Sequence, residues 1–194
     1  MRWIHLKPTD GHPMLWKNGG GTTLELAVDP PGATLDKGFR WRISSAEVGS
    51  SGPFSLFSGL ERWLLLLEGA GFEIDFGARG RVAVTEPLAP LRFSGDWPAS
   101  ATLVDGPCRD FNLMVDSRSC RAGLQILELK STQNLPLTAA TTLVFVARGT
   151  VSVPTWDLHL GHHHLLQIEH GGGELAFAPG LVGATLVRID LDPV

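Results

Sequence analysis

Cysteine is scarce in this sequence, whose 194 residues include only Cys108 and Cys120. The residues between them predict a strand through Phe111 to Val115, with the two cysteines near its opposite ends. A disulfide needs Cα atoms within about 7 Å, which a strand of that length does not allow unless it folds back. We therefore expect two reduced, packed thiols and a cytoplasmic protein.

An excess of basic residues is also missing. The chain has 16 Lys and Arg against 20 Asp and Glu, which gives a net charge of −4. Proteins that bind nucleic acid or anionic lipid carry a basic surface, so neither partner is expected. No apolar run approaches membrane-spanning length, and the N-terminus lacks the pattern of a signal peptide, so we expect no membrane segment.

Helical periodicity is missing as well. No convincing amphipathic helix of about twelve or more residues is found, and the one candidate, Leu124 to Lys130, alternates like a strand. Instead, 23 glycines and 13 prolines lie between short apolar runs, which predicts frequent turns. The composition therefore favours an all-β fold.

The clearest strands flank a glycine turn in the first half of the chain. Leu64 to Leu67 is an uninterrupted apolar run, which predicts a strand covered on both faces. After the turn at 69–71, Phe72, Ile74 and Phe76 alternate with polar residues, as in a half-exposed strand. Such a hairpin is typical of one corner of an antiparallel barrel or jelly roll.

The second half of the chain repeats this pattern. Residues 143–149 resemble 64–69, and the sequence ATLV occurs at both 101–104 and 184–187, an offset of about 80 residues. Ordered matches at nearly one offset favour a duplicated β lobe. We expect a double-stranded β-helix of the cupin or jelly-roll type, with an N-terminal lobe and ligand pocket in 1–120 and a C-terminal lobe in 121–194, together a bicupin.

Three segments place polar groups beside apolar strand patterns. Residues 16–25, WKNGGGTTLE, contain three glycines that either let the backbone approach a ligand or form only a wide turn. In residues 39–43, FRWRI, two arginines alternate with apolar residues, and they either face water or form an anion site inside a barrel. Asp110 and Asn112 share one strand face, which lines a cavity or faces water.

Taken together, these motifs resemble the HutD/Ves family. The resemblance is strongest from about Trp3 to Met114, and its motifs are WKNGGGT at 16–22 with Glu25, RWRIS at 40–44, GPFS at 52–55, Arg62, DG at 105–106 and DFNLM at 110–114. It implies a double-barrel, RmlC-like cupin fold and an association with histidine utilisation, in which members are regarded as small-molecule-responsive accessory or regulatory proteins. It implies no established reaction.

The leading hypothesis is a non-enzymatic protein that binds a small carboxylate, such as formylglutamate or urocanate, in its first lobe. Lys17 or Arg62 would pair with the carboxylate, and Asn112 would contact amide-like groups. The candidate ligand-binding residues are Lys17, Asn18, Gly19, Gly20, Gly21, Thr22, Glu25, Arg42, Ser44, Ser55, Arg62, Asp105, Asp110 and Asn112.

A metal ion is not expected in the first lobe. Metal cupins use two histidines, a glutamate and a later histidine, but the corresponding positions here are near Ser55, Phe57 and Arg62. His162 and His164 with Glu169 match the metal spacing, yet Glu169 would not share their face of a strand. We expect a polar turn there, and no cofactor.

Two other functions remain open. One is a cupin enzyme, either metal-dependent through His162 and His164 or a metal-free isomerase or hydrolase with Glu25 or Asp105 as the base; however, no nucleophile elbow or other catalytic set can be assembled. The other is an interaction module whose glycine loop docks a protein. The oligomeric state also stays open, with a homodimer by strand addition or sheet stacking as one arrangement.

Overall fold

The computed structural model describes residues 1–16, 19–169 and 172–194. Strands dominate these ranges, and the helical elements within them are the short 3₁₀ turns η1 (Pro8–Asp10), η2 (Gly77–Arg79) and η3 (Pro154–Trp156). The expectation of an all-β fold is confirmed. In the described part of the chain, no helix has the length and apolar character needed to cross a membrane.

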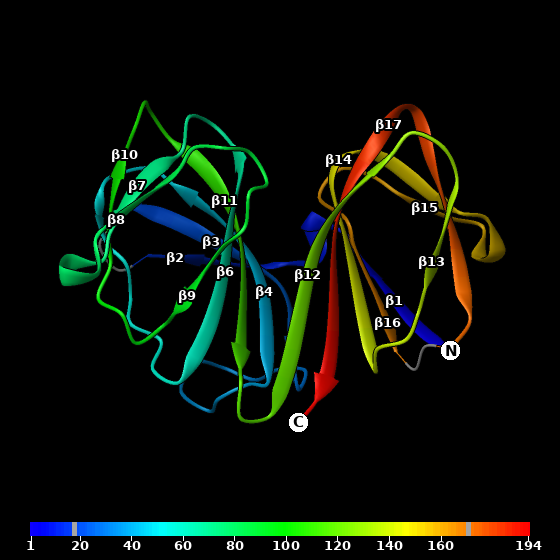
Figure 1. The fold of residues 1–194 in the computed structure, drawn as a ribbon, viewed down its shortest axis with the longest axis horizontal. Helices are drawn as coiled ribbons and strands as arrows, with labels where there is room; N and C mark the ends of the chain where they lie inside the picture. Colours follow the sequence, from blue (N-terminus) through cyan, green and yellow to red (C-terminus); the bar gives the residue numbers. More distant parts are fainter. Residues whose placement is uncertain (17–18, 170–171) are drawn as a thin grey trace. The chain divides into compact units, whose positions relative to one another are not determined.

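The chain forms two compact units (Figure 1). The N-terminal unit is Gly11–Ser119, and the C-terminal unit is Cys120–Val194 together with Met1–Asp10. In the sequence, the two units meet between residues 119 and 120. The first ten residues, however, belong to the C-terminal unit and not to the N-terminal lobe in which chain order had placed them.

Strand β1 (Arg2–Leu6) explains this assignment. It pairs antiparallel along its whole length with β16 (Leu165–Glu169), and Figure 1 shows the blue strand among the yellow-to-red strands of the C-terminal unit. Arg2 also forms an ion pair with Glu169 at 2.9 Å, and the rings of Trp3 and Trp156 stack with centroids 5.4 Å apart. These long-range contacts cannot be read from local sequence.

The N-terminal unit consists of two antiparallel sheets. The larger has the strand order β2-β3-β4-β11-β6-β9, and the smaller has the order β5-β10-β7-β8. The bounds of these strands are β2 (His12–Leu15), β3 (Gly21–Asp29), β4 (Trp41–Val48), β5 (Gly52–Pro53), β6 (Leu60–Glu68), β7 (Phe72–Asp75), β8 (Arg81–Val84), β9 (Leu91–Ser94), β10 (Ser100–Leu103) and β11 (Cys108–Asp116).

The core of the N-terminal unit combines residues from both sheets. Leu64 and Leu66 of β6 belong to one buried cluster with Phe72 and Ile74 of β7. Their neighbours on the other face of β6 are also buried, so the predicted strand covered on both faces is confirmed. Burial alternates along β7, as predicted for a half-exposed strand. The even-numbered side chains of β6 therefore define the interior face of the larger sheet.

The turn between β6 and β7 requires glycine. Gly71 has a φ of +83°, a region that residues with a Cβ rarely adopt. A methyl group there would also overlap the carbonyl oxygen of Val84 on β8. The tight turn lets β7 return directly into the smaller sheet.

The C-terminal unit has one seven-stranded sheet. Its main order is β1-β16-β14-β17-β12, with β13 paired to β17 and β15 paired to β14. The remaining bounds are β12 (Cys120–Leu129), β13 (Gln133–Pro136), β14 (Thr141–Val153), β15 (Leu158–Leu160) and β17 (Glu174–Pro193). Val144, Val146 and Leu186 lie in its core. As expected, Cys108 and Cys120 are buried thiols, but they lie at the starts of two successive strands and not near opposite ends of one strand.

Candidate functional site

Strand register gathers a set of polar side chains inside the N-terminal unit. On β11, Asn112 lies opposite Leu64 of β6 on one side and Ser44 of β4 on the other. Residues directly opposite in a sheet share a face, and Leu64 is a core residue, so Asn112 and Ser44 face the interior. Two positions along, Met114 separates Arg42 from Arg62 on the same face.

The low exposure of these polar side chains confirms that they do not lie on the surface of the protein. The exposed fractions are 4% for Arg42, 5% for Arg62, 3% for Asp110 and 6% for Asn112. Buried charged and amide side chains are rare unless they are paired or serve a function. The alternation in 39–43 could not place the two arginines of that segment. The structure turns Arg42 inward and leaves Arg40 exposed.

Arg42 has a partner within its own chain. Its Nε donates to Oε2 of Glu25 on β3, and the Glu25 side chain is itself largely buried. The two opposite charges offset one another, so Arg42 adds little net charge to the interior. Glu25 is accordingly held as an ion-pair partner, which does not suit the role of a free general base.

Arg62 is surrounded by aromatic rings. Its guanidinium carbon lies 4.9 Å from the ring centroids of both Phe57 and Phe93, and 5.8 Å from that of Phe54. These distances are within the range of cation–π attraction. The rings stabilise the cation but accept no conventional hydrogen bond, and Nε of Arg62 has no hydrogen-bond partner among the described residues.

Three polar atoms of this face have no hydrogen-bond partner among the described residues. They are Nε of Arg62, Oδ1 of Asp110 and Oδ1 of Asn112. An unsatisfied buried polar atom costs about 1–3 kcal/mol, and more when it is charged. One donor and two acceptors left open on one buried face form an arrangement that a small polar molecule could satisfy.

The electrostatics of the site follow from its burial. Burial raises the pKa of Asp110 to about 7, against the opposing effects of the Arg62 charge and a hydrogen bond from the backbone of Ala46. Burial likewise lowers the pKa of Arg62 to about 10, which the charge of Asp110 opposes. Arg62 therefore stays a cation at neutral pH, while Asp110 is divided between its acid and its carboxylate.

The C-terminal unit also contains a buried arginine, but this one has hydrogen-bond partners within the chain. Arg188 of β17 lies opposite the core residue Val144, so it faces that unit's interior. It donates to both carboxylate oxygens of Asp190 at 2.9 and 3.1 Å, and to the carbonyl of Pro136 at 2.6 Å. Arg62 has no comparable set of chain partners in the described residues, which distinguishes the two buried cations.

The glycine segment closes mainly on its own backbone. The amide of Gly19 donates to the carbonyl of Trp16, and the amide of Trp16 donates to the carbonyl of Gly21. The carbonyl of Gly20 accepts hydrogen bonds from Gly49 and Ser50. The Gly19 amide is thus already used within the chain, so it is not available to hold a ligand oxygen.

Several other predicted site residues lie away from the buried polar face. Thr22 pairs with exposed Glu47, so it is on the outer side of the sheet. Ser55 and Asp105 are exposed loop residues. Lys17 and Asn18 lie outside the described residues. The structure therefore brings together Glu25, Arg42, Ser44, Arg62, Asp110 and Asn112 from the predicted set.

The histidines at 162–164 form a turn, as predicted. Nδ1 of His164 accepts from the Gly161 amide at 3.0 Å, so Nε2 of His5, 2.8 Å away, must be the donor to it. Glu169 is held by Arg2 and by the amide of Gln167. The proposed metal set of His162, His164 and Glu169 therefore has two of its members engaged elsewhere in the C-terminal unit.

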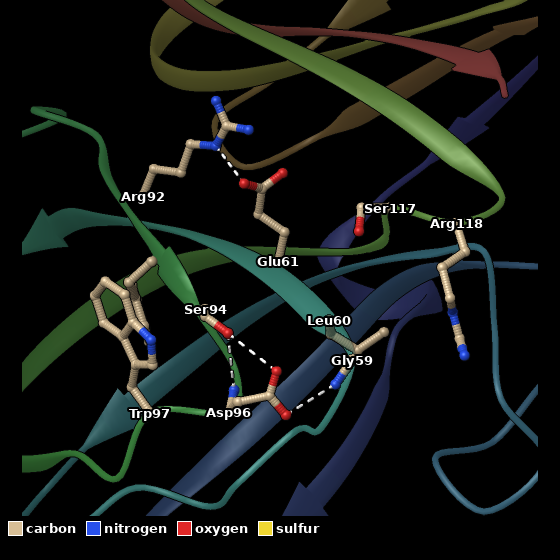
Figure 2. Close-up of a pocket in the computed structure, with 10 residues that line it drawn as sticks. Gly59, Leu60, Glu61, Arg92, Ser94, Asp96, Trp97, Ser117 and Arg118 are labelled. Atoms are coloured by element: carbon tan, nitrogen blue, oxygen red, sulfur yellow. Dashed lines mark hydrogen bonds and ion pairs between the residues drawn. The ribbon is translucent and has the colours of Figure 1, made fainter.

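A surface pocket of about 560 Å³ lies on the N-terminal unit (Figure 2). Its charged side chains have partners within the chain: Arg92 donates to Glu61 at 2.6 Å, Asp96 accepts from Ser94 and from the amide of Gly59, and Arg118 donates to Asp116. The other lining residues are Leu60, Phe93, Trp97 and Ser117. None of the described residues predicted for the site lines this pocket.

Comparison with solved structures defines the class of this fold. A cupin 2 conserved barrel domain protein from Leptotrichia buccalis superimposes with a TM-score of 0.60 at 9% identity, covering 93% of this chain and 96% of that protein. That likeness concerns the fold alone. Together with the all-β sheets described above, it places the chain among the cupin-fold proteins, as expected from the sequence.

Closer relatives give the family. The HutD family model matches residues 9–182, and the chain belongs to the HutD family. A protein of Pseudomonas putida described as an uncharacterized 21.2 kDa protein in the hutC 3' region is 38% identical over 88% of both chains. The structure of HutD from Pseudomonas fluorescens SBW25 has a TM-score of 0.85 at 35% identity over both full chains. Protein Ves of Escherichia fergusonii is 40% identical over 59% of this chain and 58% of its own.

The aromatic surroundings of Arg62 could not be predicted from the sequence. Phe54 and Phe57 precede β6, and Phe93 lies directly opposite Arg62 on β9. Phe54 is part of the GPFS motif, but its contact with Arg62 depends on a loop folding back over the sheet. No spacing in the sequence specifies that contact.

Proposed function

We propose that this chain is a small-molecule-binding bicupin of histidine utilisation, whose N-terminal unit receives a small carboxylate. The observation that carries the proposal is the buried guanidinium of Arg62, whose Nε has no hydrogen-bond partner among the described residues. A carboxylate is the natural complement of an arginine, because its oxygens accept charge-assisted hydrogen bonds.

A neighbouring acceptor narrows the class of ligand. Oδ1 of Asn112 also needs a donor, so a molecule that combines a carboxylate with an N–H group would complement the face better than a simple anion. Formylglutamate offers carboxylates and a formamide N–H, and urocanate offers a carboxylate and an imidazole N–H. Both remain the leading candidates.

The names of two relatives support this context. The Pseudomonas putida relative is named for its position in the hutC 3' region, and the Pseudomonas fluorescens HutD structure is described as a formate condition. Formate is the smallest carboxylate. We infer an accessory or regulatory role in the cytoplasm, in which the protein responds to an intermediate of histidine breakdown.

Thermal unfolding with and without ligand tests the proposal. At pH 6.5, formylglutamate or urocanate at about 100 times its dissociation constant should add about 2.7 kcal/mol of stability. Arg62→Met should abolish this shift. Arg81→Met, which removes an exposed arginine on β8, should preserve it. If neither carboxylate stabilises the wild-type protein at any concentration up to tens of millimolar, the proposed function is wrong.

A further inference from the structure

The charges that face the interior of the N-terminal unit nearly cancel when Asp110 is ionised. Arg42 is matched by Glu25, and Arg62 is then matched by Asp110. Burial raises the pKa of the nearby Cys108 thiol to about 11, so it stays neutral. The facing strands of the smaller sheet contribute apolar side chains to this core, namely Phe72, Ile74, Val84 and Ala101.

This balance matters for the entry of an anion. With Asp110 as a carboxylate, a second carboxylate beside Arg62 would leave one negative charge uncompensated in a buried site, which is costly. With Asp110 as a neutral acid, the face carries one net positive charge, and the ligand neutralises it. The acid form also supplies an O–H donor, and an O–H···O⁻ hydrogen bond is short and strong.

We propose that a carboxylate ligand and one proton enter this site together, with the proton carried on Asp110, so that neutral Asp110 and cationic Arg62 both donate to the ligand. The inference rests on the proposed function of the same site. It stands on the geometry of the buried face, where Oδ1 of Asp110 and Nε of Arg62 both lack partners among the described residues. The raised pKa of Asp110 means that the free protein holds this proton readily near neutrality.

Proton-coupled binding has a defined pH profile. Below about pH 7 the free protein already carries the proton, and the affinity should change little. Above pH 7 each binding event must take up a proton, so the dissociation constant should rise about tenfold per pH unit. The ligand would therefore be released as the pH rises, without any change in the ligand's own charge.

Isothermal titration calorimetry with formylglutamate between pH 6 and 9 tests this coupling, because the carboxyl groups of the probe stay ionised throughout that range. The wild-type protein should show the tenfold weakening per unit above pH 7. Asp110→Asn keeps the shape, stays neutral and can still donate, so it should bind with an affinity independent of pH. Glu86→Gln, which removes an exposed acid, should retain the wild-type profile.

A second measurement needs no variant. At pH 8, titrations in two buffers of different ionisation enthalpy should report the uptake of about one proton per bound ligand. Wild-type binding with no proton uptake and a flat pH profile would overturn the coupling while leaving the proposed function intact. An absence of binding at every pH, including pH 6, would instead remove the proposed function itself.

Discussion

Replacing Arg62 with methionine tests whether this buried cation serves ligand binding or the stability of the fold. Burial of a guanidinium costs several kcal/mol, and each of the three aromatic contacts returns about 0.5–2 kcal/mol, so the two contributions nearly offset. Methionine has a similar length and gains about 0.3–1.5 kcal/mol against each ring. We expect the free energy of unfolding of ligand-free Arg62→Met to stay within about 1 kcal/mol of wild type.

Arg188→Met provides the matched comparison. Arg188 is buried to nearly the same degree, but it donates to both oxygens of Asp190 and to the carbonyl of Pro136. Its removal leaves a carboxylate and a carbonyl without their donor, so the loss of stability should be about 3 kcal/mol. The same substitution in the two units should thus have different costs.

Urea denaturation followed by the fluorescence of the six tryptophans measures both values. The experiment is done in a buffer without carboxylates, so that no buffer anion occupies the site. If Arg62→Met loses 3 kcal/mol or more with an unchanged denaturant slope, as expected for Arg188→Met, then Arg62 supports the fold and the reasoning for a ligand group is refuted.

Three further predictions concern stability, each measured by urea unfolding. Between its ordinary pKa of 3.8 and its folded pKa of about 7, Asp110 holds a proton in the folded protein that the unfolded chain has lost, so a rise in pH through this range should destabilise the wild type. The loss should be at most about 4 kcal/mol and absent in Asp110→Asn; equal profiles for the two proteins would contradict this. Burial lowers the pKa of His5 and of His164, so in the Asp110→Asn background, which lacks the opposing Asp110 effect, stability should fall as the pH drops below 6.5, and less steeply when His164→Asn is added; a flat Asp110→Asn profile down to pH 5 would show that the pair is not coupled to folding. Gly71→Ala should lower the free energy of unfolding by about 3 kcal/mol or more, because it adds a backbone clash to a left-handed φ. Gly106→Ala, with φ +65° and open space around it, should lower it by about 1 kcal/mol. Similar losses for the two variants would mean that the clash at residue 71 is relieved.

The strands of the N-terminal unit could be predicted because their patterns are local. The apolar run 64–67 and the alternation after it determine which faces are covered, and both predictions are confirmed in β6 and β7. The inward direction of Arg42 could not be predicted, because it depends on the register of β4 against β11. Register is a contact between segments about 70 residues apart, and no periodicity within one segment specifies it.

The internal repeat shows that a short sequence identity does not by itself identify equivalent structural positions. Residues 101–103 fall in β10, on the smaller sheet, and Val104 follows its end, whereas 184–187 fall in β17 and pair with β14. By its pairing with the long apolar strand, that part of β17 corresponds to β11 and not to β10. The identity of ATLV thus reflects a shared preference for β-branched and apolar residues in strands, and it does not identify equivalent positions.

The placement of β1 has a consequence for dissecting the molecule. The polypeptide starts in one sheet, crosses to build all of the other unit, and then returns to finish the sheet that it began. A protease cut after residue 119 would leave β1 on the N-terminal fragment, separated from its pairing partner. The C-terminal fragment would keep β16 but lose β1, which pairs with it. The N-terminal fragment would hold its whole unit plus a surplus strand, whereas the C-terminal fragment would lack β1, so a circular permutant that joins residue 194 to residue 1 and opens the chain at residue 11 would place each unit in one continuous stretch of sequence.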